Sequence, residues 1–206
     1  MHRKNGETNE LVLAYTTIYE IQYVEDPATD DTSPLLGQEV NINGVVTAEF
    51  WGSSNNRQMF VQDAEGPWNG IQCYRNEGWD TFEWVDASGL PYPNGPAEGD
   101  EVTLSGTVES FSGGTQLGSV SLGMVHGPAA QMITPSIVSF GDVGEAEEGC
   151  LVALERKHVD SENPDAPGGE YGECTVSDGT NYVSLYYPGY TIAPPSIKCH
   201  TSVTRK

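Results

Sequence analysis

The sequence predicts an all-β protein made of two tandem barrels, the second of them incomplete. Three observations predict this: short stretches with a two-residue apolar alternation, glycine and proline between them, and a weak internal repeat. The 206 residues include 24 Gly and 13 Pro, and 37% are hydrophobic. This composition is typical of many short strands joined by tight turns, in a chain long enough for one large domain or two small ones.

The first half of the chain predicts an arm, a polar loop and five strands. Residues 11–23 predict an extended arm or a short helix-like entry, within an arm and loop that spans residues 1–36. Period-two alternation between turn residues predicts the strands of a first barrel at 37–126, namely 39–51, 57–64, 70–76, 100–112 and 114–125. The region around 79–87 carries only a weak helical pattern.

The second half repeats this order. A linker rich in Gly, Pro and Glu occupies residues 127–148. After it, residues 149–159 correspond to the first strand, and residues 173–187 correspond to the hairpin at 59–74. In register, Val61-Gln62-Asp63 aligns with Val176-Ser177-Asp178, and 71–74 aligns with 183–186. Only 199–204 resembles part of a fourth strand, so the predicted barrel at 149–206 is incomplete.

Four stretches carry a resemblance to a known kind of module. They are TIYEIQY before the barrel, GVVTAEF as strand 1, MFVQDAEGPWNGIQCY as strands 2 and 3, and GDEVTLSGTVESFSGGTQL as strand 4 and the turn into strand 5. The chain resembles there, over residues 17–187, the OB-fold modules of secreted bacterial proteins, often found beside extracellular nuclease or lamin-tail domains. The resemblance implies Greek-key barrels of five strands whose strand 2–3 face and loops bind the ligand.

The composition is strongly acidic, which bears on partners and location. Nine Lys and Arg stand against 30 Asp and Glu, a formal net charge of −21. Because nucleic-acid affinity comes largely from Lys and Arg that displace counterions, we expect no binding of free nucleic acid.

No apolar run reaches the roughly 18 residues that span a bilayer, so we expect no membrane insertion. We expect an extracellular or cell-surface protein, with a signal peptide absent from this chain.

Asp63 ends the second predicted strand, in front of a Gly-Pro-Trp turn. A catalytic carboxylate needs a partner such as a second carboxylate, a His or a metal, and no His is near in sequence. Asp178 also ends a strand before a Gly, so we interpret Asp63 as a turn cap that binds the backbone of the next residues. No nucleophile elbow or phosphate loop occurs, and we predict no catalytic residues and no enzyme activity.

Aromatic residues gather around the turns of the first barrel. The candidates for a stacking platform that would bind a sugar, a base or a peptide are Trp68, Tyr74, Trp79 and Trp84. The alternative is that these rings close the barrel as part of its core.

Calcium is the one cofactor that the sequence suggests. Asp160, Glu162 and Asp165 would supply oxygen ligands, without the order of an EF-hand loop, and residues 25–31 form a weaker candidate. Solvated loops are the alternative in both places. The four cysteines match no metal or redox motif, and buried free thiols and one disulfide both stay open.

The incomplete second barrel predicts self-association. Proteins rarely leave strand edges open, so a strand from another subunit would complete the barrel, with Leu11, Leu13 and Tyr15 of the arm inserted. Such a head-to-tail contact builds filaments. A truncated chain is the alternative account of the missing strands. The predicted function is a non-catalytic extracellular OB-fold module for protein binding or self-assembly; the alternative is an accessory substrate-binding domain of a secreted nuclease, which the charge disfavours.

Overall fold

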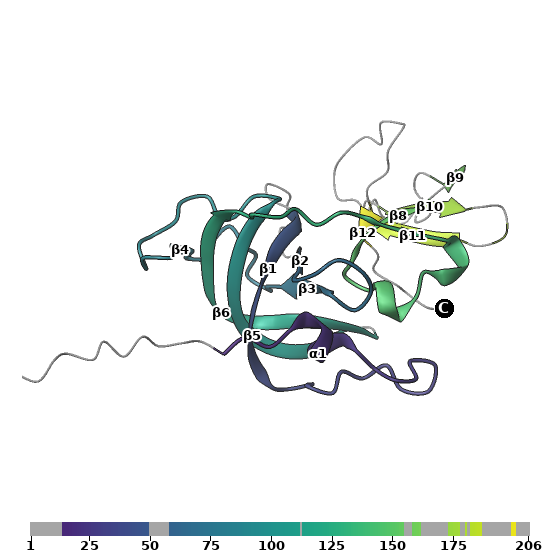
Figure 1. The fold of residues 1–206 in the computed structure, drawn as a ribbon, viewed down its shortest axis with the longest axis horizontal. Helices are drawn as coiled ribbons and strands as arrows, with labels where there is room; N and C mark the ends of the chain where they lie inside the picture. Colours follow the sequence, from purple (N-terminus) through teal and green to yellow (C-terminus); the bar gives the residue numbers. More distant parts are fainter. Residues whose placement is uncertain are drawn as a thin grey trace, which may run out of the picture.

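The computed structural model describes residues 14–49, 58–111 and 113–154, Thr180, and the backbone of four further strands. The chain is mostly β, which confirms the predicted fold class at that level (Figure 1). Two single-turn 3-10 helices, η1 (Phe140–Asp142) and η2 (Glu145–Glu147), lie in the linker. The other elements are α1 (Ile18–Gln22), β1 (Glu39–Glu49), β2 (Gln58–Gln62), β3 (Gly70–Tyr74), β4 (Val85–Asp86), β5 (Asp100–Phe111), β6 (Gly114–Pro128), β7 (Ser136–Val138), β8 (Leu151–Leu154), β9 (His158–Ser161), β10 (Glu173–Ser177), β11 (Tyr182–Tyr186) and β12 (Cys199–His200).

Five strands of the first half close a ring. β1 pairs antiparallel with β2 and β5, β2 pairs with β3, and β5 pairs with β6; a parallel β3–β6 pairing completes the circuit. The β1–β2 register shifts between Val46 and Ala48, a bulge that bends the strand as barrel closure requires. Gly44 allows the close approach of β2, because a Cβ there would meet the Gln62 carbonyl oxygen. All five strands lie where the alternation predicts them.

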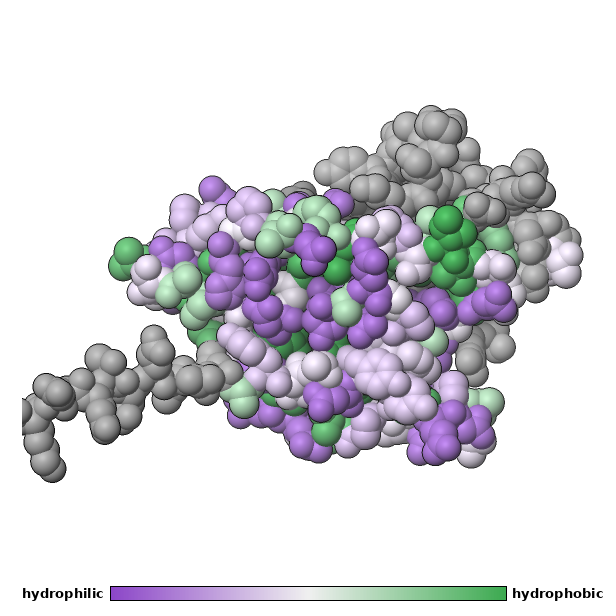
Figure 2. Space-filling view, in the orientation of Figure 1, coloured by the Kyte–Doolittle hydropathy of each residue, from purple (hydrophilic) through white to green (hydrophobic). Residues whose placement is uncertain are grey.

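The interior of this barrel is apolar and both of its ends are closed. Inward side chains of the strands are fully buried, among them Ile42, Val61 and Leu104 at 0% exposure. α1 packs where β2 ends and β3 begins, and the loop after β3 fills the opposite end. On the face shown in Figure 2, hydrophilic residues cover most of the barrel, in keeping with the acidic composition.

The N-terminal segment packs against its own barrel, and of the two predicted forms, extended arm or short helix-like entry, the structure shows the helix at α1. Thr17 and Glu20 form a capping box at the start of α1, and Ile18 and Ile21 are 0% exposed in the core. The Thr16 amide donates to the Asn41 carbonyl at 2.8 Å. Ile18 and Ile21 are spaced by three residues, as one apolar face of a helical turn requires, and this spacing agrees with the helix-like alternative.

The second half contains two small sheets, with strand orders β12-β8-β7 and β11-β10-β9. The β10–β11 hairpin matches the predicted repeat: Val176 lies opposite Val183, as Val61 lies opposite Ile71 in β2–β3. Among the described strands no pairing closes a second ring. Within the same residues, no helix has the length and apolar character that a membrane crossing requires.

The pairing of β9 refines the predicted repeat. Val159 lies opposite Val176, as Val46 lies opposite Val61 in the first barrel. By register, Val159 is therefore the counterpart of Val46. It is the last residue of the stretch 149–159, which was predicted to correspond to the first strand. β12 pairs antiparallel with β8, as β5 pairs with β1.

Candidate functional site

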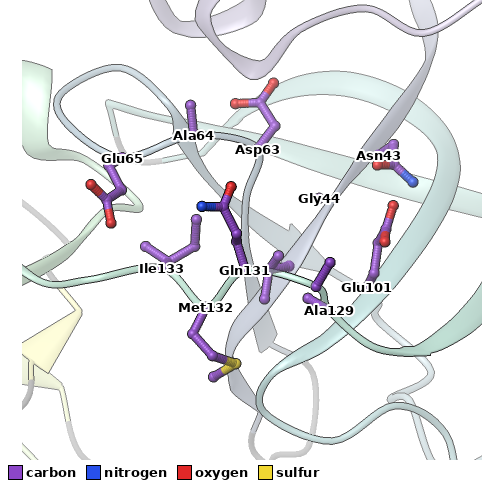
Figure 3. A pocket seen from close by; sticks show the side chains of 12 residues that line it. Asn43, Gly44, Asp63, Ala64, Glu65, Glu101, Ala129, Gln131, Met132 and Ile133 are labelled. Atoms are coloured by element: carbon purple, nitrogen blue, oxygen red, sulfur yellow. The ribbon is translucent and has the colours of Figure 1, made fainter.

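A groove of about 560 Å³ lies over the outer face of β1 (Figure 3). Three parts of the chain enclose it: β1 with its neighbour β5, the tip of the β2–β3 hairpin, and residues 129–133, here called the strap. Its lining residues are Asn43, Gly44, Val45, Asp63, Ala64, Glu65, Glu101, Ala129, Ala130, Gln131, Met132 and Ile133.

Hydrogen bonds hold the strap at both ends. The Ala129 amide donates to the Gly99 carbonyl at 2.9 Å, and the Thr134 amide donates to Glu65 Oε1 at 3.2 Å. Between these anchors, Gln131 projects into the middle of the groove (Figure 3). The strap therefore forms a fixed wall, and one oxygen of Glu65 is committed to holding it.

Asn43 and Glu101 form the opposite side of the groove. They are diagonal neighbours on the outer face of the β1–β5 pair, because Asn43 lies opposite Thr103 and Val45 opposite Glu101 (Figure 3). The Asn43 amide nitrogen donates to Thr103 Oγ1 at 3.2 Å, and this hydroxyl is 2.9 Å from His126 Nε2. This bond uses one of the two donors of the amide nitrogen, and the amide oxygen of Asn43 is left to accept from a ligand.

Asp63 holds α1 rather than its own turn. Its Oδ2 accepts a 2.7 Å hydrogen bond from the Ile18 amide, 45 residues earlier, so the predicted bonds to the next residues are corrected. Its carboxylate is turned away from Gln131 (Figure 3), and no described donor reaches the buried Oδ1. Burial raises the pKa of Asp63 above its usual value, against the opposing effect of the Ile18 amide.

Replacing Asp63 by Ala is expected to lower the free energy of unfolding by about 0.5–2 kcal/mol, the range for a lost helix cap. The reason is that the Ile18 amide loses its acceptor at a buried place. Thermal and urea denaturation would measure the change, with Glu25→Ala on the exposed loop as control. An unchanged stability would show that α1 does not depend on this contact.

The lining chemistry is that of an acceptor site. The twelve lining residues include three carboxylates and two amides, and none of them is Lys, Arg, His, Ser or Cys. Carboxylates and amide oxygens attract cations and hydrogen-bond donors. The arrangement therefore suits a positively charged ligand.

The structure leaves the calcium prediction open. Asp160 lies in β9, of which only the backbone is described, and Glu162 and Asp165 lie outside the described residues. In the weaker candidate, Asp26 accepts from the Thr29 hydroxyl and Asp30 from the Thr32 amide, which are local turn contacts. Among the residues that the structure describes, no group of three His, Cys, Asp or Glu could hold a metal ion.

The predicted aromatic platform is wrong for two of its four members. Trp79 and Trp84 are 1% and 3% exposed, and their rings stack on each other at 5.5 Å in the core. Arg75 lies over the ring of Phe82 beside them, 4.6 Å from its centre. These tryptophans close the barrel, the alternative that the sequence left open, because the loop after β3 folds inward.

Trp68 and Tyr74 are half-buried, and Trp68 joins a different aromatic group. Its ring meets Tyr23 edge-on at 5.5 Å, and Tyr23 stacks on Tyr19 at 4.9 Å. The backbone of Trp68 adopts a φ of 67°, which is unusual for a bulky residue, and the Trp68 amide donates to the Ala146 carbonyl at 2.6 Å. The four-residue spacing of the two tyrosines was the available sequence signal for this cluster.

The linker and β8 cover one end of the β2–β3 face. The Leu151 amide donates to Gln62 Oε1 at 2.5 Å, and Gln62 is only 1% exposed. The backbones of Gly70 and Gly149 approach so closely that neither has room for a Cβ. Cys150, a free thiol, is buried beside the Gly66 carbonyl. Part of the surface on which an OB-type barrel would bind a ligand is therefore covered by the chain itself.

Comparisons with known proteins supply no relative. No family model, no curated protein and no solved structure matches the chain. The functional argument accordingly rests on the residues of this chain.

Proposed function

We propose that this chain is a non-catalytic extracellular module for protein binding or self-assembly, built on an OB-type barrel and a second, partial unit of the same kind. The closed ring of five strands and the matching register of the β2–β3 and β10–β11 hairpins support the OB-type interpretation. The proposal does not extend to an accessory nuclease domain, because a net charge of −21 opposes contact with a phosphate backbone.

One observation carries the binding proposal: the open groove beside the covered β2–β3 face offers carboxylates and amides. Glu101 and Asn43 on one side and Gln131 on the other are set on elements fixed by hydrogen bonds. A rigid surface with a single sign of charge selects partners of the opposite charge and speeds their encounter.

Self-assembly by strand exchange stays part of the proposal in a narrower form. The first ring is closed, so a donated strand would have to join the second half. The segment from Ala14 onward is held on its own barrel, because the Asn41 side chain donates to the Ala14 carbonyl and the Thr16 amide donates to the Asn41 carbonyl. A donor arm is therefore restricted to the residues before Ala14, which removes Tyr15 from it. Tyr15 is 52% exposed, and Leu11 and Leu13 lie outside the described residues.

Sedimentation of the full chain and of a deletion of residues 1–13 tests the assembly. We expect the full chain to form species larger than a monomer in moderate salt, because strand pairing and burial would dominate the contact. The deletion should sediment as a folded monomer, since Thr17, Ile18 and Ile21 are retained. A full chain that stays monomeric at high concentration, or a deletion that assembles equally well, would remove strand donation from the proposal.

A further inference from the structure

We propose that the groove over β1 binds a segment of a partner protein through a Lys or Arg side chain of that segment. This inference rests on the proposed binding function and names its partner chemistry. The cation would lie against Glu101 and the Asn43 amide oxygen, with the rest of the segment along the strap.

The charge of the groove is the first support. Asp63, Glu65 and Glu101 reach it from the end of β2, the hairpin tip and β5. Arg75 is the one Lys or Arg whose side chain is described, and it is engaged elsewhere, with Glu77 and over Phe82. Arg75 therefore does not neutralise these carboxylates, and the groove presents negative charge that suits a ligand of the opposite sign.

The position of each acceptor decides which would touch the cation. Asp63 contributes charge rather than contact, because Ile18 holds its Oδ2 and its Oδ1 is buried. Glu65 gives one oxygen to the strap. Glu101 and Asn43 lie diagonally on one strand pair, so a carboxylate and a side-chain amide are set side by side for one donor group (Figure 3).

The apolar part of the lining favours an organic cation over a metal ion. Val45, Ala129, Ala130 and Ile133 line the same space, and Met132 is 58% exposed at the strap. Lys and Arg place a long aliphatic stem against apolar surface while the charged end stays polar, and Met adapts to varied contacts. The volume of about 560 Å³ falls in the range of organic-ligand pockets. A protein segment would also bring neighbouring residues to cover Met132.

Two peptides that differ in one group test the proposal on the full chain. Both are blocked nine-residue peptides of Ala and Leu, one with a central Arg and the other with the neutral isostere citrulline. NMR titration is expected to show the Arg peptide binding about tenfold or more tightly, the size of an added charged hydrogen bond. The shifted amide signals should be those of residues 43–45, 101 and 129–133.

A matched pair of variants locates the contact. Glu101→Gln should weaken the Arg peptide about tenfold and leave the citrulline peptide unchanged. Glu39→Gln removes the same charge from an exposed place on β1 outside the groove and should leave both affinities unchanged. Thermal melts show whether both variants fold. If Glu101→Gln unfolds, Glu65→Gln takes its place, and it should also weaken binding of the Arg peptide.

Several results would overturn the proposal. Equal affinities for the two peptides would exclude recognition of the cation. If Glu39→Gln weakened the Arg peptide as much as Glu101→Gln does, the effect would come from the net charge of the protein and not from the groove. Calcium that shifts the same signals at a lower concentration than the peptide would make the groove an ion site. None of these outcomes depends on the sedimentation result, so failure here is distinguishable from failure of the assembly proposal.

Discussion

Glu148→Gln is expected to stabilise the protein above pH 8 and to flatten the dependence of its stability on pH. The Glu148 carboxylate lies between the linker and the tip of the β5–β6 hairpin, with Oε2 3.5 Å from the Thr115 amide. Burial, together with the neighbouring Glu145 and the repulsion from Asp31, raises its pKa to about 8, against the opposing effect of the Thr115 amide. Gln keeps the shape and removes the charge.

The sign follows from proton linkage. The ordinary pKa of 4.5 applies to the unfolded chain, and the folded value is about 8. The folded state therefore holds a proton between these values that the unfolded state releases, so stability is greatest below pH 4.5 and falls as pH rises through 8. Ionised Glu148 next to Glu145 and Asp31 then costs about 1–3 kcal/mol, a figure reduced from the full shift because the group is only partly enclosed.

Thermal denaturation from pH 5 to pH 9 measures this effect. The wild-type melting temperature should fall across the range, and that of Glu148→Gln should fall much less. In the Glu148→Gln variant a smaller fall of the melting temperature with pH should remain, because burial also raises the pKa values of Glu147 and Asp63. Glu25→Gln on the exposed loop is the control and should follow the wild type. Parallel curves for wild type and Glu148→Gln would contradict the burial of an ionisable group at this junction.

Gly70→Ala is expected to separate the second half from the barrel. A Cβ on Gly70 would overlap the Gly149 carbonyl, and a backbone group cannot turn aside as a flexible side chain does. The neighbouring contacts would open with it: the bond from Leu151 to Gln62, and the 2.7 Å bond from Gln22 Nε2 to the Gly70 carbonyl. Forced overlap of this kind costs about 1–3 kcal/mol.

Limited proteolysis of the linker and thermal melts test this expectation. The variant should be cleaved faster between residues 139 and 150, while the barrel core around Ile42 and Val61 stays protected from hydrogen exchange. Gly144→Ala is the matched control in the same linker, since an added Cβ there meets only the Asp142 carbonyl at 3.9 Å. A Gly70→Ala protein with unchanged cleavage and melting would show that the halves are not held by this contact.

Local sequence signals were enough to predict the five strands of the first ring and their hairpins, but not the short strands β4, in the region with a weak helical pattern, and β7, in the predicted linker. Alternating apolar residues between Gly, Pro and Asn turns define where β2 and β3 begin and end, because side-chain alternation and turn conformation are decided within a few residues. The same reasoning placed the β10–β11 hairpin in register with β2–β3, with Val176 opposite Val183 as Val61 is opposite Ile71. The charge was likewise evident, since it depends on composition alone.

The roles of individual side chains were decided only by contacts between distant parts of the chain. Asp63 ends a strand next to a turn, yet its partner is Ile18, brought to it because the apolar face of α1 must be buried. Trp79 lies in a polar loop that folds inward to fill the barrel end, since burying a large ring gains more than leaving it in water. The groove joins β1, β5, the hairpin tip and the strap, and no local pattern encodes such a meeting. Periodicity reports which way a side chain points along its own strand, whereas its partner is set by the packing of the whole barrel.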